Sequence, residues 1–258
     1  MKKLRNVSEP EVVAEFLKAE YYRAEFDHDR QQFETLVYAP DLASRHENTV
    51  RQALLFRRRG AMWRELPSDV QWWDIEPDEG DLERINVFPR AQWRTISDGN
   101  FKAVHVAERI RKQLDKGETD DLLAKIKLLK TRLQYEGPKS TVMLIGVDET
   151  RTVTLLEGNH RFVASLLLPR EIMLRRLRLI CGFSPNMDKC CWYKTDFFNL
   201  VHYAKNRIKH LWDREGDLND LPPAAEVAAT AHSYVSAAGV QSVFQTENPN
   251  NANFEKTH

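Results

Sequence analysis

One short stretch decides the fold: Leu155-Leu156-Glu157-Gly158-Asn159-His160-Arg161-Phe162. A β-rich run ends at Glu157, Gly158 allows a tight turn, and a helix with an apolar face begins. Asn159 is a favourable N-cap residue, and free N–H groups at a helix start favour an anion. His160 and Arg161 add phosphate donors, and Glu157 could accept a proton or hold a metal ion. The stretch suits phosphate binding with proton transfer, and a capped acidic turn with solvated side chains is the alternative.

Regular elements surround this turn. Strand-like segments lie at 70–76, 141–147, 152–156 and 177–181. Segments with helical periodicity lie at 101–115, 119–135, 160–168 and 195–212. The two strands that flank the turn at 148–150 predict a hairpin just before Glu157.

The first 60 residues are mostly helical in pattern. Ser8 and Glu11 fit a capping box, and Asp41 can cap the helix that follows Pro40. A basic run that ends in Gly60 is typical of a helix C-terminus.

The expected fold class is α+β, with a small mixed sheet and packed helices. We expect an N-terminal helical segment at 1–69 and the main domain at 70–212. A connector with a C-terminal helix at 213–244 and a disordered polar tail at 245–258 complete the expected organisation.

The turn and the order of the elements resemble the ParB/sulfiredoxin-like superfamily. Sulfiredoxins carry G-C-H-R at this turn, ParB proteins carry G-E-R-R, and free-serine kinases carry D-G-H-H-R. The run Glu157–Arg161 is most similar to the last of these. Gly182-Phe183-Ser184-Pro185, followed by Trp192-Tyr193, is similar to uncharacterised bacterial ParB-like proteins with an E-G-H-x-R turn. The resemblance covers roughly residues 70–195 and implies a ParB/sulfiredoxin-like fold.

This resemblance implies a nucleotide site. In the superfamily the turn binds nucleotide phosphates, which implies phosphate contacts for Gly158, Asn159, His160 and Arg161. It further implies a nucleoside di- or triphosphate with Mg²⁺, and a kinase-like transferase or a nucleotide hydrolase with Glu157 or His160 in proton transfer. Asn159 replaces the reactive cysteine of sulfiredoxins, which argues against sulfinic-acid reduction.

Other candidate site residues lie on both sides of the turn. In the serine kinases an acidic residue of an early loop acts as base, and the acid-rich segment 74–83 is the corresponding region. We name Glu76 there, although a solvated loop also explains such a charge run. Ser184, Trp192 and Tyr193 are the candidates for a substrate pocket.

The cysteines do not predict a metal site. Cys181 stands alone, and Cys190 and Cys191 are adjacent rather than spaced as C-x-x-C, so we expect small buried thiols.

Composition excludes some classes of protein. The chain is 42% hydrophobic and 29% charged, which argues against collagen-like, disulfide-scaffold and wholly disordered chains. It has 38 Lys+Arg against 38 Asp+Glu, so its net charge gives no reason to bind nucleic acid or a membrane. Arginines at 170–178 and bases at 202–210 make one locally basic region.

The expected function is a nucleotide-dependent enzyme that acts on a small-molecule acceptor. A ParB-like nucleic-acid-associated regulator or nuclease, and a non-catalytic nucleotide-binding module, are the alternatives. The longest apolar run has six residues, at 163–168, and the first residues lack a signal-peptide pattern. With three cysteines, these features favour the cytoplasm.

Overall fold

The computed structural model describes residues 1–27, 30–89, 92–135 and 137–219. These residues belong to one compact unit, Met1–Leu221. The C-terminal helix expected near 224–240 and the tail at 245–258 lie outside the described residues. The connector expected from residue 213 is not seen as such, because the helix before it continues to Asn219.

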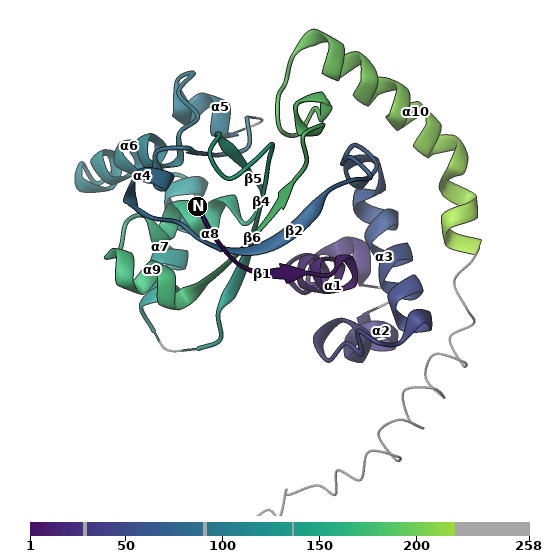
Figure 1. Cartoon of the computed structure of the whole chain (residues 1–258). Coiled ribbons are helices and arrows are strands. Elements are labelled where there is room, and N and C mark those ends of the chain that lie inside the picture. Colours follow the sequence, from purple (N-terminus) through teal and green to yellow (C-terminus); the bar gives the residue numbers. More distant parts are fainter. Residues whose placement is uncertain (28–29, 90–91, 136, 220–258) are drawn as a thin grey trace, which may run out of the picture. The chain divides into compact units, whose positions relative to one another are not determined.

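Within the described residues, six strands form one mixed sheet between two groups of helices (Figure 1). They are β1 (Lys2–Val7), β2 (Gln71–Glu76), β3 (Ile85–Asn86), β4 (Ser140–Gly146), β5 (Val153–Glu157) and β6 (Leu177–Phe183). The spatial order is β1-β2-β6-β4-β5-β3. The pairs β4–β6 and β3–β5 are parallel, and the other neighbours are antiparallel. The mixed sheet confirms the expected fold class, and the β4–β5 pair confirms the hairpin.

Helices cover both faces of the sheet. One group consists of α6 (Ala103–Asp115), α7 (Asp121–Gln134), α8 (Asn159–Ser165) and α9 (Arg170–Arg176). The other group consists of α1 (Glu9–Glu20), α2 (Arg30–Tyr38) and α3 (Arg45–Trp63). The remaining helices are α4 (Glu79–Leu82), α5 (Gln92–Ser97), α10 (Phe197–Asn219) and the 3₁₀ turns η1 (Ala24–Phe26) and η2 (Met187–Lys189). No described helix has the length and apolar character that a membrane span requires.

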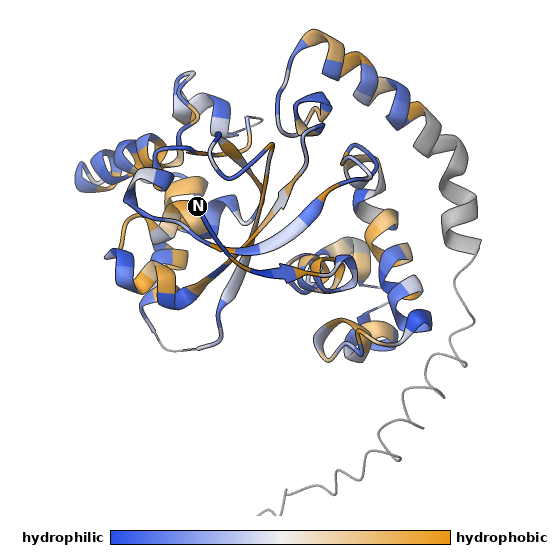
Figure 2. Cartoon of the chain, in the orientation of Figure 1, coloured by the Kyte–Doolittle hydropathy of each residue, from blue (hydrophilic) through white to orange (hydrophobic). Residues whose placement is uncertain are grey.

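The central strand β4 shows why helices cover both faces of the sheet. Val142, Met143, Leu144 and Ile145 are all buried, although neighbouring side chains of a strand point to opposite faces. A continuous apolar run of this kind is typical of a strand covered on both faces. Figure 2 shows hydrophobic segments along the central strands and on the helices that flank them.

An ion network joins α1 to three strands. Arg178 of β6 donates Nε to Asp74 Oδ1 of β2 at 2.8 Å and Nη2 to Glu11 Oε1 of α1 at 2.5 Å. Arg5 of β1 pairs with the same two carboxylates. Four residues later on α1, the Glu15 carboxylate accepts the hydroxyl of a β4 threonine. These contacts fix the N-terminal helices against the sheet.

The sequence did not predict β1. Four of its six residues are polar and only Val7 is buried, so the strand carries no hydrophobic periodicity. It pairs with β2, so the segment 1–69 completes the sheet of the expected main domain.

The short helices α5 and α9 were also missed. Their six and seven residues are too few to establish a helical repeat in the sequence.

Two expectations about helix ends were wrong, and a third is half confirmed. Ser44 caps α3, while Asp41 accepts the N–H of Ala43. The helix α3 also continues through Gly60 to Trp63, because helical hydrogen bonds persist beyond the glycine. The N–H of Glu11 donates to the Ser8 hydroxyl, as expected for a capping box. The Glu11 carboxylate binds arginines instead of the backbone at the helix start, so the second half of the box is not formed.

We predict that Glu11→Gln lowers the free energy of unfolding by about 2 kcal/mol at neutral pH, because hydrogen bonds to charged groups are lost. The hydrogen bond from Arg5 holds the pKa of Glu11 below its usual value of 4.5. The stability that ionised Glu11 contributes is therefore present above that value and is lost as the pH falls below it. Urea unfolding at several pH values should show the difference between variant and wild type shrinking in acid.

The control for this prediction is Glu9→Gln, an exposed carboxylate in the first turn of the same helix. It should cost less than Glu11→Gln. Equal losses in the two variants, or a constant difference between Glu11→Gln and wild type down to acid pH, would contradict the role given to the network.

Candidate functional site

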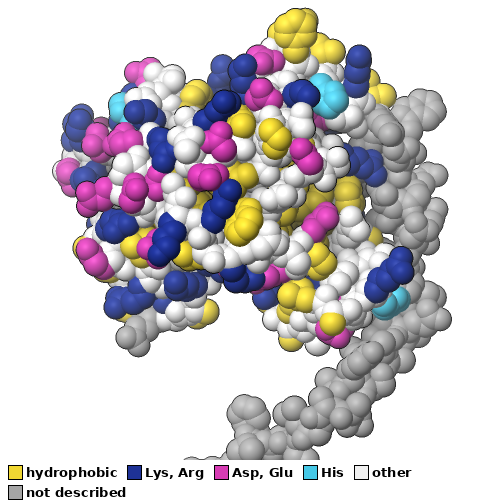
Figure 3. Space-filling view, in the orientation of Figure 1, with side chains coloured by type: hydrophobic (Ala, Val, Ile, Leu, Met, Phe, Trp, Pro, Cys, Tyr) yellow, Lys and Arg dark blue, Asp and Glu magenta, His cyan; other side chains and the backbone are white. Residues whose placement is uncertain are grey.

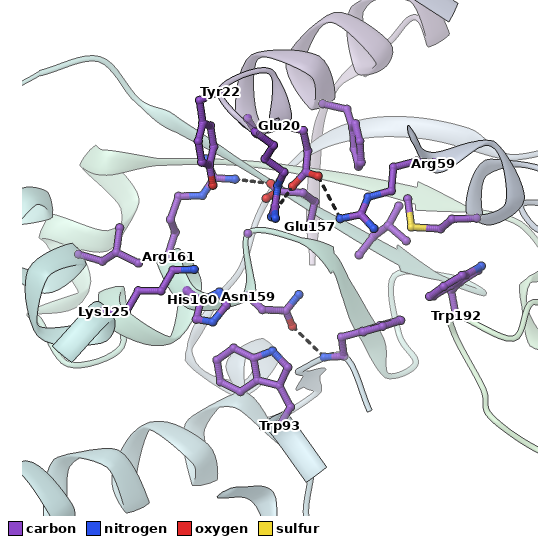
Figure 4. Close-up of a pocket in the computed structure, with 18 of the residues that line it drawn as sticks. Glu20, Tyr22, Arg59, Trp93, Lys125, Glu157, Asn159, His160, Arg161 and Trp192 are labelled. Atoms are coloured by element: carbon purple, nitrogen blue, oxygen red, sulfur yellow. Dashed lines mark hydrogen bonds and ion pairs between the residues drawn. The ribbon is translucent and has the colours of Figure 1, made fainter. Parts of the chain in front are cut away.

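A cavity of about 380 Å³ lies between the N-terminal helices and the end of β5 (Figure 4). Among the described residues, five cationic side chains and two carboxylates line it. They are Arg23, Arg59, Lys125, Arg132 and Arg161, with Glu20 and Glu157. The aromatic rings of Phe88, Trp93 and Trp192 contribute apolar walls. An excess of positive charge in a concave, partly aromatic site favours an anionic ligand with a planar group.

A β-bulge delivers Glu157 to this cavity. Met143 of β4 pairs with Glu157 while Leu144 pairs with Leu155, so Leu156 is an extra residue in β5. As a result, both Leu156 and Glu157 line the cavity.

Gly158 makes the turn that follows. Its φ of +84° lies in the left-handed region, and a Cβ there would lie 2.9 Å from Val142 Cγ2. A side chain is therefore excluded for two independent reasons. Gly158, rather than the expected Asn159, is the N-cap of α8.

The side-chain amide of Asn159 binds two backbone groups. Its Oδ1 accepts the N–H of Phe88 at 2.8 Å, and its Nδ2 donates to the carbonyl of Leu155 at 3.4 Å. This fixes Phe88 beside the turn. Since α8 has only seven residues, we do not assign the expected anion site to its first N–H groups. The cationic side chains around the cavity are the better candidates for contacts to an anion.

Glu157 is a carboxyl group with a perturbed acidity. Burial raises its pKa, although the neighbouring Arg161 acts against the shift, and the nearby carboxylate of Glu20 reinforces it. The carboxylate of Glu157 accepts from Arg161 Nη2 and from the N–H of Gly158. A raised pKa makes the ionised carboxylate a stronger base than an exposed glutamate, which suits it to accept a proton.

Arg161 has two partners within the protein. Besides Glu157, its Nη1 donates to Ser140 Oγ at 2.9 Å. The side chain therefore orients Glu157 and has only its remaining N–H groups for a ligand.

His160 is held neutral. Burial lowers its pKa to about 4, and the charges of Lys125, Arg23 and Arg161 act in the same direction. Its Nε2 lies 2.5 Å from Gln92 Nε2, and its ring lies 5.0 Å from that of Trp93. With the amide donating, Nε2 is the acceptor and Nδ1 carries the proton. In this state His160 is a weaker base than the sequence suggests, and Glu157 is the better candidate.

Only one of the three expected pocket residues lines this cavity. Trp192 does, and its ring stacks on Phe88 at 5.1 Å. Ser184 donates to Asp69 at 2.6 Å, and the Tyr193 hydroxyl donates to the backbone of Thr152 at 2.9 Å. These two candidates stabilise other parts of the chain.

Glu76 also lies apart from Glu157. It ends β2, which β6 and β4 separate from β5, and it lines a different cavity. At about 4.8 Å per strand step, the two strands are about 14 Å apart.

The contribution of the N-terminal helices to the cavity was not predicted. Glu20, Arg23 and Arg59 reach the cavity only because α1 and α3 lie on the sheet. The sequence could have placed Lys125 and Arg132 together, because they lie seven positions apart and so share a face of the expected helix.

The three cysteines are buried, as expected. Burial raises the pKa of Cys190 to about 12, so its thiol is not ionised near neutral pH. Within the described ranges, no group of three or more His, Cys, Asp and Glu side chains is placed to hold a metal ion.

Comparison with protein-family models gave no match, and neither the curated proteins nor the solved structures gave a significant match.

We predict that the His160 imidazole titrates near pH 4 in the folded protein. Because the folded pKa lies below the usual histidine value of 6.5, the unfolded state binds the proton more tightly. The free energy of unfolding should therefore fall between pH 6.5 and pH 4, by at most about 1.4 kcal/mol per pH unit.

The measurement is an NMR titration of the histidine ring protons, with the His160 signal assigned from its loss in His160→Gln. A midpoint near 6.5 would show that the ring is not held neutral by burial and by the surrounding cations.

Proposed function

We propose that this protein is a nucleotide-dependent enzyme whose cavity binds a nucleoside di- or triphosphate and transfers or hydrolyses a phosphoryl group. The observation that carries the proposal is the placement of the Glu157 carboxylate in a cavity lined by five cationic side chains, where burial also raises its pKa. Phosphoryl transfer requires positioned cations for the phosphates and an acceptor for the proton of the attacking hydroxyl. Both requirements are met by side chains within one cavity.

The phosphates would bind at the α7 side of the cavity. Lys125 and Arg132 are exposed on α7 and have no hydrogen bond or ion pair with other described residues. Their charges are therefore available to a ligand. The rings of Trp93 and Trp192 offer apolar surfaces for a planar base.

The chemical step follows from this placement. A hydroxyl oxygen of the acceptor, or of water, attacks the terminal phosphorus, and its proton passes to ionised Glu157. The bond from phosphorus to the bridging oxygen breaks, and the shortened nucleotide leaves with both electrons of that bond. Lys125 and Arg132 stabilise the charge that develops on the phosphate oxygens.

In this proposal Mg²⁺ enters the cavity bound to the phosphates of the nucleotide. Both carboxylates of the cavity are paired with arginines, so the protein offers few free oxygen ligands there. Mg²⁺ commonly binds to substrate phosphates and keeps several waters, and it would supply charge neutralisation in that form.

The fold is proposed to be the ParB/sulfiredoxin-like one. The support is the sequence of elements: an antiparallel hairpin, the E-G-N-H-R turn, the helix α8 and the strand β6. The cytoplasmic location also belongs to this proposal, as the compartment that supplies the nucleotide.

The nucleic-acid alternative has less support from the structure. The cavity has the size of a small-molecule site. On the face shown in Figure 3, Lys and Arg side chains alternate with Asp and Glu rather than gathering into a basic patch.

A panel of nucleoside di- and triphosphates with Mg²⁺ tests the proposal by calorimetry and by ³¹P NMR. We expect the Lys125→Gln variant to bind the preferred nucleotide about tenfold more weakly, since one charge-assisted contact is lost. Its matched control is Lys127→Gln, which removes an exposed charge of the same helix outside the cavity.

Glu157→Gln should bind the nucleotide and lose turnover by about 10²-fold or more, because the proton acceptor is removed. Binding without turnover in the wild type would indicate the non-catalytic module instead. No nucleotide binding, together with DNA binding that weakens steeply with salt, would favour the nucleic-acid alternative.

A further inference from the structure

The N-terminal segment contributes two arginines to the cavity. Arg59 projects from α3 and Arg23 follows the end of α1, and both reach Glu20. Figure 4 shows Arg59 on the opposite side of Glu157 from Lys125. Arg59 and Lys125 therefore lie on opposite sides of the proposed proton acceptor.

Glu20 fixes both guanidinium groups in place. Its side chain is only 2% exposed, and it lies 2.9 Å from Arg23 Nη2 and 3.0 Å from Arg59 Nη2. Among the described side chains, Glu20 sets one negative charge against the two positive charges of Arg23 and Arg59, in a partly buried place. A positive charge in such a place attracts an anion more strongly than it would in water.

Both arginines also have an unsatisfied donor. The Nε atoms of Arg23 and Arg59 are buried and have no hydrogen-bond partner among the described residues. A buried donor without an acceptor is unfavourable, because the group has lost its hydrogen bonds to water. An oxyanion placed beside the two guanidinium groups would supply the missing acceptors.

We propose that Arg23 and Arg59 form a second anion subsite, which binds the carboxylate or phosphate group of the small-molecule acceptor. The proposal rests on the proposed function for the identity of the first ligand, the nucleotide at the Lys125 end. An acceptor anchored at Arg59 would extend toward Glu157, and its hydroxyl would meet the phosphoryl group there. The acceptor is therefore an acidic small molecule, and Glu20 is a positioning residue that acts through the arginines.

The test is calorimetric titration of inorganic phosphate and, separately, of succinate into the full chain saturated with ADP. We expect one of these anions to bind while ADP is present, and the tighter of the two identifies the group that the subsite prefers. Arg59→Gln should weaken that binding about tenfold or more, since a bidentate charge-assisted contact is lost. The control Arg45→Gln removes an exposed charge at the start of the same helix and should leave the binding unchanged.

The titrations distinguish failure of the acceptor subsite from failure of the nucleotide site. If ADP binds but neither anion binds with it, the acceptor subsite is overturned and the nucleotide site stands. If ADP does not bind, the same titrations are run without it, and Arg59→Gln must still weaken anion binding more than Lys125→Gln does. An equal effect of those two variants, or of Arg59→Gln and Arg45→Gln, overturns the subsite.

A second variant separates loss of the anion subsite from loss of the fold. Arg59→Lys keeps the charge and loses the planar fork, so it should give an intermediate loss of anion affinity. ADP affinity and the thermal midpoint of each variant report on the fold independently. Loss of anion binding in Arg59→Gln with both of these preserved supports the subsite, and full anion affinity in Arg59→Gln contradicts it.

Discussion

The ion network around Arg178 is the constraint on which the cavity depends. It joins β6 and β2 to Glu11 near the start of α1, and Glu15 adds a contact to β4. With its first turns fixed in this way, α1 ends over the carboxyl end of β5. Glu20 therefore faces the same cavity as Glu157, and the carboxylate of Glu20 is one of the causes of the raised pKa of Glu157.

The turn after β5 supplies the other half of the site. The bulge at Leu156 brings Glu157 into the cavity, and Gly158 permits the reversal because Val142 leaves no room for a side chain. Asn159 holds Phe88 to this turn, and Phe88 stacks on Trp192. Gly158 and Asn159 thus have structural reasons that are independent of any ligand, while the proposed chemistry rests on Glu157 and the cations around it.

Sequence patterns predicted the elements that have strong periodicity. The hairpin, the strands β2 and β6, and the helices α6 and α7 follow from runs of apolar residues at regular spacing. The polar strand β1 was missed because its pairing with β2, rather than its own composition, determines it. Glu157 and His160 were found because they lie on the recognisable turn, and Trp192 because it follows the Ser184-Pro185 segment. Arg59 could not be found in this way, because its place in the cavity depends on long-range packing of α3.

The crystal structure of the protein with ADP tests the central claim most directly, because it shows where the phosphates lie. We predict phosphate oxygens within hydrogen-bond distance of Lys125 on the α7 side of Glu157, with Arg23 and Arg59 left free for a second anion. ADP bound at another surface, or phosphates that contact none of these cations, would contradict the account of this cavity as a nucleotide site.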